Sequence, residues 1–123
     1  MGANVNQGAV YVFVKPAGGW VTTSAATAQL VSSDGEDYDN FGYSVALSGD
    51  TIVTSAGGDA IGANSDQGSA YVFAKPTGGW VSATQTAKLI DSNPAPSNLL
   101  GWCVLAHDDL VLVGAPNETH SPG

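Results

Sequence analysis

One short stretch of the chain places four carboxylates around a glycine, a composition typical of a loop that binds a metal ion. The stretch reads Asp34-Gly35-Glu36-Asp37-Tyr38-Asp39-Asn40. Carboxylate and amide oxygens are the hard ligands that Ca²⁺ prefers, so Asp34, Glu36, Asp37 and Asp39 are candidate Ca²⁺ ligands. No Glu follows at the closing position of a twelve-residue EF-hand loop. A solvated acidic turn is the simpler interpretation of the same residues.

A second group of oxygen ligands, Asp59, Asn64 and Asp66, lies in the segment GGDAIGANSDQG. These three residues are an alternative metal loop. Asn and Asp beside Gly are also the ordinary residues of turns, so a turn without metal remains open here too. Apart from Ca²⁺, the sequence indicates no cofactor.

The residues available for catalysis are few. His107 and His120 are the only histidines, and we expect both to be exposed to solvent. No Gly-x-Ser-x-Gly motif for a nucleophile is present. Cys103 is the only cysteine, so it cannot form an intrachain disulfide, and we expect it to pack as a small buried residue. We therefore predict that the protein is not an enzyme.

The charge balance excludes two classes of partner. Three Lys and Arg stand against eleven Asp and Glu, which gives a formal net charge of −8. Binding to nucleic acid or to an anionic membrane needs clustered cations, so neither is expected. No run approaches the ~20 apolar residues that cross a bilayer, and the first ten residues lack the pattern of a secretory signal, so we expect no membrane insertion.

An internal repeat organises the whole chain. Asn4 to Val21 aligns without gaps on Asn64 to Val81, with twelve of eighteen positions identical. Further along, FGYSVALSGDTIVTSAG (41–57) aligns more weakly on LGWCVLAHDDLVLVGAP (100–116). Gly and Pro punctuate the sequence, and strong helix formers with charged faces are few, which predicts an all-β protein.

Each period contains four runs typical of short β-strands separated by turns. Four antiparallel strands with no room for crossover helices form the blade of a β-propeller. The eight expected strands lie at or within 9–14, 20–31, 42–47, 51–55, 69–74, 80–90, 101–106 and 109–113.

These residues resemble the FG-GAP repeats of integrin alpha-subunit propellers and of bacterial surface proteins. Phe41-Gly42 matches the FG end of the family motif, and Gly114-Ala115-Pro116 matches the GAP end. The resemblance implies packing roles: the Gly beside an aromatic allows neighbouring blades to approach, and Gly-Ala-Pro ends a strand where a side chain would crowd. It also suggests an extracytoplasmic or cell-surface location. Integrin-type Ca²⁺ loops do not transfer, because the matching turns, Ser48-Gly49-Asp50 and His107-Asp108, are too short.

Counted from Phe41, the chain consists of a half-blade (about 4–31), a whole blade (about 41–90) and a second half-blade (about 100–116). Two blade-equivalents cannot close a ring of four to eight blades. We therefore expect either a fragment of a larger FG-GAP surface protein or a homo-oligomer with four, six or eight blades in total.

The alternation of strands predicts which loops share one end of the molecule. That end would receive the long loops and eight of the eleven carboxylates, and long loops on a rigid scaffold are common binding sites. We expect a non-enzymatic adhesion module that presents this acidic face to a protein or a glycan, or else a purely structural self-assembling scaffold. Trp20, Trp80 and Trp102 could contact carbohydrate, although the resemblance implies that they pack between blades. The eight carboxylates are Asp34, Glu36, Asp37, Asp39, Asp59, Asp66, Asp91 and Glu118.

Overall fold

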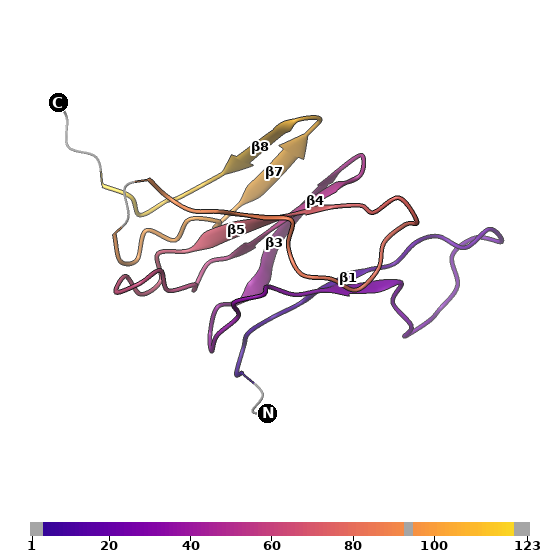
Figure 1. The fold of residues 1–123 in the computed structure, drawn as a ribbon, viewed down its shortest axis with the longest axis horizontal. Helices are drawn as coiled ribbons and strands as arrows, with labels where there is room; N and C mark the ends of the chain where they lie inside the picture. The colour runs from indigo at the N-terminus through magenta and orange to yellow at the C-terminus, as the bar shows by residue number, and fades with distance from the viewer. Residues whose placement is uncertain (1–3, 93–94, 120–123) are drawn as a thin grey trace.

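The computed structural model describes residues 4–92 and 95–119, and the regular structure in these residues is entirely β (Figure 1). All eight strands overlap the ranges that the sequence predicts, with β3, β4 and β7 extending one residue beyond them, and the all-β fold class is confirmed. None of the described residues forms a helix with the length and apolar character needed to cross a membrane. The strands are β1 (Val10–Val12), β2 (Ala28–Leu30), β3 (Phe41–Ser48), β4 (Thr51–Ala56), β5 (Ser69–Ala74), β6 (Ala87–Leu89), β7 (Val104–His107) and β8 (Leu110–Val113).

The central sheet has four strands in the order β3-β4-β5-β6, each antiparallel to the next. This order is consistent with a propeller blade. The β3–β4 turn holds Gly49 at φ +55°, a conformation that costs glycine little. Strand β4 is buried along nearly its whole length, because it has a neighbouring strand on each side and a neighbouring sheet over each face.

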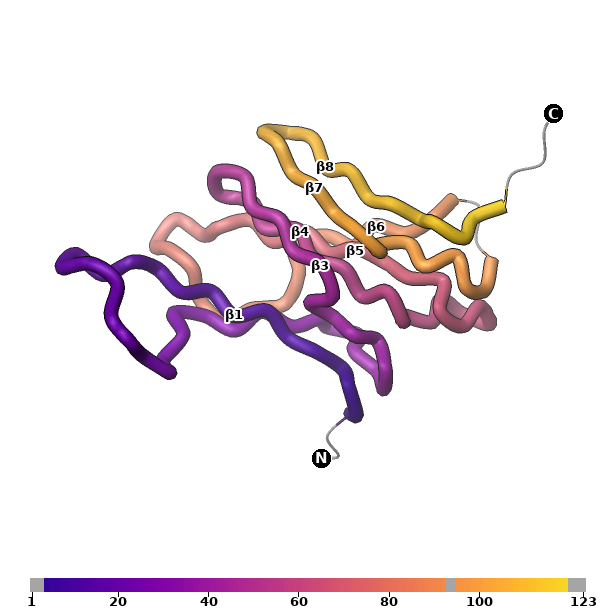
Figure 2. Tube along the Cα trace, turned by 180° about the vertical axis from the view of Figure 1, so that it is seen from behind, coloured from indigo at the N-terminus to yellow at the C-terminus, as the bar shows by residue number. Residues whose placement is uncertain are grey.

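Two-stranded sheets flank the central sheet, β1–β2 on one side and β7–β8 on the other. Figures 1 and 2 show the three sheets side by side in chain order. Each gap between sheets holds a hydrophobic core. Successive side chains of a strand point to opposite faces, so Ile52 contributes to the core beside β1–β2 and Val53 to the core beside β7–β8.

The same backbone contact joins the sheets at both gaps. Gly8 forms a parallel bridge with Phe41, and Gly68 forms one with Leu100. A Cβ atom would lie 2.0 Å from the carbonyl oxygen of Phe41 at Gly8, and 2.2 Å from that of Leu100 at Gly68. The sequence repeat is therefore also a repeat of the packing between sheets.

The two halves of the family motif differ in their surroundings. Phe41 is buried and packs edge-on against Tyr71 with ring centroids 5.2 Å apart, and Gly42, at φ +91°, lies against the backbone of Ala9. Around Gly114 the single chain shows no such crowding. A Cβ atom there would meet only the carbonyl oxygen of Cys103, at an ordinary 3.8 Å, because it would project from the outer face of β7–β8, the face that also carries the exposed Leu112. Ala115 and Pro116 follow directly after this strand, and Pro116 is exposed.

Candidate functional site

Carboxylates from the two candidate metal loops meet around a lysine that the sequence did not single out. Asp34 lies between β2 and β3, Asp59 lies between β4 and β5, and Lys88 is on β6. The Lys88 Nζ binds Asp34 Oδ2 and lies 2.8 Å from Asp59 Oδ2. The Tyr71 hydroxyl donates a hydrogen bond of 2.9 Å to Asp34 Oδ1 and lies 3.2 Å from Asp59 Oδ2. We call these four residues the Lys88 cluster.

Burial and pairing act in opposite directions in this cluster. Burial alone would lower the pKa of Lys88, but its hydrogen bonds to Asp34 and Asp59 outweigh this effect and raise the pKa. Burial likewise favours a higher pKa for Asp34, and the bonds from Lys88 and Tyr71 hold it below the ordinary value. Asp59 is almost completely buried and also accepts a 2.6 Å hydrogen bond from the Ser69 hydroxyl. Lys88 therefore supplies the cation that these carboxylates need.

Asp39 lies close to this cluster without a cationic partner of its own among the described residues. Burial, together with the nearby negative charges of Asp59, Glu36 and Asp34, raises its pKa to about 6. The backbone N–H of Glu36 donates a 2.8 Å hydrogen bond to Asp39 Oδ2, which opposes the shift only in part. The Asp39 carboxylate therefore changes charge near mildly acidic pH.

The other candidate ligand positions of the first loop have structural contacts. Asp37 Oδ1 accepts a 2.8 Å hydrogen bond from the backbone N–H of Val5, which fixes the N-terminal segment to the loop. Glu36 contributes its backbone to a turn with Asp39. Within the described ranges, no three His, Cys, Asp or Glu side chains gather in a way that could hold a metal ion. Ca²⁺ binding stays a prediction of the sequence.

The alternative loop has turn contacts of the kind that its sequence also allowed. Asn64 Nδ2 donates to Gln67 Oε1 at 3.2 Å, and the equivalent Asn4 Nδ2 donates to Gln7 Oε1 at 3.0 Å. Asp66 has a left-handed backbone with φ +54°, a conformation that Asp and Asn tolerate better than most residues. Asn64 and Asp66 therefore shape the turn, and only Asp59 joins the Lys88 cluster.

The expectation for Cys103 is wrong, because this side chain is exposed. It precedes Val104, whose side chain points into the core beside the central sheet, so Cys103 points to the opposite, uncovered face. His107 is exposed as expected, with its Nδ1 3.6 Å from Asp108 Oδ2. His120 lies outside the described residues.

Exposed aromatic rings line a groove near the loops. Trp80 packs against the core beside β1–β2. Trp20 and Trp102 are exposed, so these two side chains do not pack between sheets. The Trp102 ring tilts against that of Tyr43, with centroids 5.5 Å apart. Both rings line a groove of about 220 Å³, whose other lining residues are Asn40, Gly57, Gly58, Asp66 and Leu99. Tyr43 and Trp102 occupy equivalent positions in the repeat, but the repeat alone does not show that their rings are neighbours.

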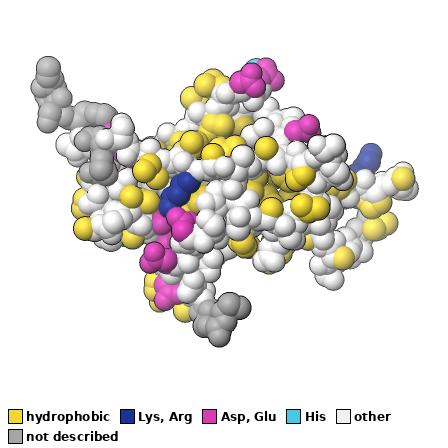
Figure 3. Space-filling model, in the orientation of Figure 1, with side chains coloured by type: hydrophobic (Ala, Val, Ile, Leu, Met, Phe, Trp, Pro, Cys, Tyr) yellow, Lys and Arg dark blue, Asp and Glu magenta, His cyan; other side chains and the backbone are white. Residues whose placement is uncertain are grey.

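Backbone hydrogen bonds tie the loops around this groove together. The N–H of Gly58 donates to the carbonyl of Asp39, and the N–H of Leu99 donates to that of Asp66. Ser97 N–H donates to the carbonyl of Ser65. The loops 31–40, 57–68 and 95–99 are therefore neighbours in space. On the face seen in Figure 3, Asp and Glu side chains gather beside a Lys side chain.

The comparisons with known proteins give one family. Residues 25–73 match the family model for the FG-GAP repeat. No curated protein and no solved structure matches the chain. The matched segment spans β2, β3, β4 and most of β5, including the Phe41-Gly42 motif and both loops that carry the carboxylates of the Lys88 cluster. The match shows that residues 25–73 contain an FG-GAP repeat, in agreement with the internal repeat and the antiparallel all-β architecture.

Proposed function

We propose that the protein is a non-enzymatic β-propeller binding module, and that its carboxylate-bearing loop end binds a glycan or a protein partner. The groove at Tyr43 and Trp102 is the observation that carries this proposal. Aromatic faces stack on the C–H face of a sugar ring, and nearby amide and carboxylate oxygens accept hydrogen bonds from sugar hydroxyls. Asn40 and Asp66 provide such groups beside the two rings. A few polar groups in a mostly apolar groove are typical of small-ligand sites.

The surrounding charge favours a ligand with hydroxyl or cationic groups over an anionic one. Lys88 neutralises part of the negative charge of Asp34 and Asp59, while Glu36, Asp37 and Asp66 lie in the same adjoining loops. A surface of one sign raises the association rate of an oppositely charged partner and repels a partner of the same sign. A basic protein surface is therefore the alternative ligand class at this end.

The absence of catalysis is part of the proposal. Glycoside hydrolysis ordinarily uses a pair of carboxyl groups that flank the scissile bond, and of the described residues only Asp66 brings a carboxylate to the lining of the groove. His107 is in an exposed turn with Asp108, and the turn is separate from the groove lined by Tyr43 and Trp102. We expect no turnover of the bound ligand.

A glycan array followed by titration tests the proposal. We expect binding to a glycan, with affinity reduced at least about tenfold by Trp102→Ala, since the stacking surface is lost. Trp20→Ala is the matched control, because Trp20 is also exposed but does not line the groove. A partner that binds through charge alone would instead lose affinity in high salt, whichever Trp is replaced.

The titration is repeated with millimolar Ca²⁺. If Ca²⁺ strengthens binding and Asp37→Ala removes that gain, the first candidate loop acts as a metal site. If Trp102→Ala and Trp20→Ala have equal effects on every ligand tested, the groove is not the binding site and the proposal fails.

A purely structural scaffold is the second candidate function. It is favoured by large apolar side chains that remain exposed on the two outer sheets, among them Tyr11, Val14, Leu110 and Leu112. Isolated surface hydrophobics are ordinary, but a continuous apolar sheet face marks a contact surface.

A further inference from the structure

The outer strands expose side chains that their equivalents in the central sheet bury. Tyr71 and Phe73 on β5 are 0% and 2% exposed, whereas their equivalents are 58% exposed at Tyr11 on β1 and 46% exposed at Phe13 directly after it. Val53 on β4 is completely buried, whereas its equivalent Leu112 on β8 is 54% exposed. Strands that are equivalent in the repeat therefore differ in their surroundings: β4 and β5 pair with each other in the central sheet, whereas β8 and β1 each lack that neighbouring strand.

We propose that β8 of one copy pairs antiparallel with β1 of a second copy, so that β7–β8 and the partner's β1–β2 complete a four-stranded sheet. The template is the pairing of β4 with β5 in the central sheet, where Thr51 lies opposite Ala74 and Ala56 lies opposite Ser69. This proposal concerns a different surface from the loop groove and does not depend on it. Carried over through the repeat, the register pairs Leu110 with Val14, Val111 with Phe13, Leu112 with Val12, and Val113 with Tyr11.

The backbone of β8 has the polarity that this pairing needs. Alternate residues of an antiparallel strand direct both their N–H and C=O groups to one side. The Gly114 N–H donates to the carbonyl of Cys103, so Gly114 faces β7. Val111 and Val113 therefore direct their N–H and C=O groups to the outer edge of β8.

The outer edge of β1 is complementary. The Thr27 N–H donates to the carbonyl of Val12, so Val12 faces β2 and both Tyr11 and Phe13 direct their backbone groups outward. In the proposed register, these two residues lie opposite Val113 and Val111. Both members of each pair thus present a donor and an acceptor to one another. Open edges of this kind are templates for pairing with another chain.

Side chains on the two outer faces are also complementary. Val10, Val12, Val45, Leu47 and Ile52 line part of an open, mostly apolar groove of about 310 Å³ between β1 and β3. On β7–β8, Leu105, Leu110 and Leu112 form an exposed apolar ridge. In the core between the central sheet and β7–β8, the contacting positions are the repeat equivalents of this ridge and this groove: Val53 corresponds to Leu112, and Val111 corresponds to Ile52. Repeating that packing places the ridge of one copy in the groove of the next.

A charge pair supports the same register. Lys75, directly after β5, has its Nζ 3.2 Å from Asp50 Oδ1, and its backbone N–H donates to the Asp50 carbonyl at 2.8 Å. The equivalent residues are Lys15, in the segment that follows β1, and Asp109, in the β7–β8 turn. Lys15 makes no ion pair within the part of the chain that the structure describes. The proposed contact brings Lys15 to Asp109 of the neighbouring copy.

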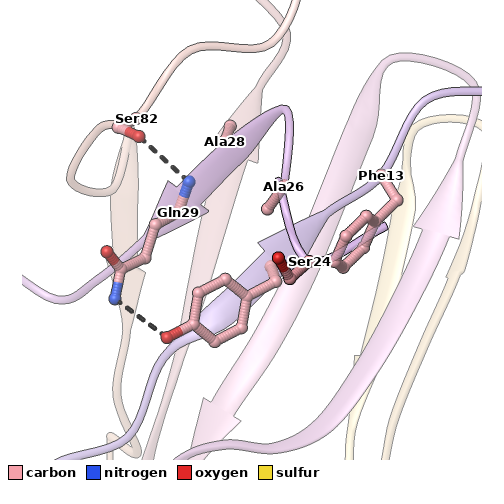
Figure 4. A pocket seen from close by; sticks show the side chains of 7 residues that line it. Phe13, Ser24, Ala26, Ala28, Gln29 and Ser82 are labelled. Atoms are coloured by element: carbon pink, nitrogen blue, oxygen red, sulfur yellow. Dashed lines mark hydrogen bonds between the residues drawn. The ribbon is translucent and has the colours of Figure 1, made fainter. Parts of the chain in front are cut away.

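Three residues of the Lys88 cluster also have repeat equivalents in the completed sheet. Gln29 occupies the position of Lys88, and its Nε2 lies 3.3 Å from the Tyr11 hydroxyl. Figure 4 shows Gln29 among the side chains that line the pocket on this side of β1–β2. Asp59, which approaches Tyr71 in the central sheet, has Glu118 as its equivalent after β8. The partner's Glu118 would therefore approach Tyr11 and Gln29.

A second copy is the occupant that the repeat favours, because every copy carries one β1 edge and one β8 edge. Residues 4–21, which include β1, share twelve of eighteen positions with residues 64–81, which include the strand that β4 already binds. Head-to-tail contacts of this kind close into rings when the rotation between copies allows it.

Disulfide trapping tests the register. In a Cys103→Ser background, Val14→Cys combined with Leu110→Cys places cysteines at opposed positions whose backbone groups face away from each other. Such pairs have Cα atoms ~4.5 Å apart, within the disulfide range. We expect intermolecular cross-links on mild oxidation. Phe13→Cys combined with Leu110→Cys shifts the pairing by one residue, puts the two side chains on opposite faces, and should not cross-link.

Mass measurement tests the association itself. The 12.4 kDa chain should form a discrete oligomer, and Leu112→Lys should convert it to a folded monomer, because a charge would be buried against the apolar groove. Val81→Lys is the matched control, since Val81 is 55% exposed and lies away from the groove and the ridge, and it should leave the mass unchanged.

Three outcomes would overturn the proposal. One is a monomer at all accessible concentrations. Another is an oligomer that persists unchanged in Leu112→Lys. The third is cross-linking of the shifted pair with equal efficiency, which would mean that the strands do not meet in this register.

Discussion

Lys88 is the side chain on which the loop end depends most directly. It is one of only three cations in a chain with eleven carboxylates, and it contacts carboxylates from two separate loops. A buried carboxylate without a partner is strongly unfavourable, whereas an exposed ion pair contributes little. Its energetic importance therefore follows from the burial of Asp59 more than from the number of contacts.

Lys88→Met should lower the free energy of unfolding by about 2–3 kcal/mol, less than for a fully buried pair because Asp34 is partly exposed. Lys75→Met is the matched control, since the Lys75–Asp50 pair is exposed and should cost at most about 1 kcal/mol. The loss for Lys88→Gln should lie between those for Lys75→Met and Lys88→Met, because an amide at this position can still contact Tyr71. Urea unfolding measures all three, and equal losses for Lys88→Met and Lys75→Met would contradict the assignment.

Asp39 gives the protein a pH dependence of known sign. Its pKa is raised from 3.8 to about 6 in the folded state, so between these pH values the folded protein holds a proton that the unfolded chain releases. Stability should therefore increase as the pH falls from above 6 towards 4. Asp34, whose pKa is lowered, acts in the opposite direction and loses its contribution below about pH 4.

Asp39→Asn isolates this effect, since the amide keeps an acceptor oxygen for the Glu36 N–H and carries no charge. At pH 7.5 the variant should be more stable than the wild type by about 1–2 kcal/mol, and the difference should vanish near pH 4. Thermal unfolding across this pH range measures the difference. A constant offset between the two proteins would show that Asp39 does not titrate as described.

At the scale of the elements, glycine sets how closely the sheets approach. Gly8 and Gly68 both have positive φ and both lie against backbone of the following sheet, at Phe41 and Leu100. A side chain at either position would displace backbone, which cannot rearrange as a flexible side chain can. The spacing between sheets is therefore fixed by the repeat itself.

Gly68→Ala should destabilise the protein by about 2–4 kcal/mol, from the strained backbone together with the clash at Leu100. Gly78→Ala is the control, because nothing lies within 4 Å of a Cβ there and its φ is not positive. It should change stability by less than about 0.5 kcal/mol. Chemical denaturation compares the two, and a small loss at Gly68 would mean that the sheets can separate at low cost.

At the scale of the whole molecule, the described residues form three sheets with two cores between them, and they leave an apolar face uncovered at each end of the series. An FG-GAP repeat suggests a propeller, in which such faces are covered by neighbouring blades. The number of blades and the closure of a ring stay predictions. What covers the outer faces decides how much of the stability depends on association.

If copies associate through β8 and β1, the melting temperature should rise with protein concentration, because association stabilises the folded state by mass action. Each tenfold increase in concentration should raise it by about 2–5 °C. Leu112→Lys should abolish the dependence while Val81→Lys retains it. Differential scanning calorimetry over two decades of concentration measures this, and a flat response in the wild type would argue against assembly.

The sequence by itself determined the strands and the repeat. Val, Tyr and Phe in short runs between Gly and Pro identify β5 at its observed bounds, because alternation and turn residues are local properties. It also supplied the carboxylates of the loop end, and it named Trp20, Trp80 and Trp102 together without separating the one that lines the groove.

Only the tertiary structure decided which of those residues meet. Asp34 and Lys88 are far apart in the chain, and no spacing rule relates a loop before β3 to a strand after β5. The exposure of Cys103 was missed for a related reason: alternation tells which side chains share a face, but only the neighbouring sheets determine which face is covered. Local patterns thus fixed the elements, and long-range packing decided that Lys88 lies between two carboxylates assigned to separate metal loops.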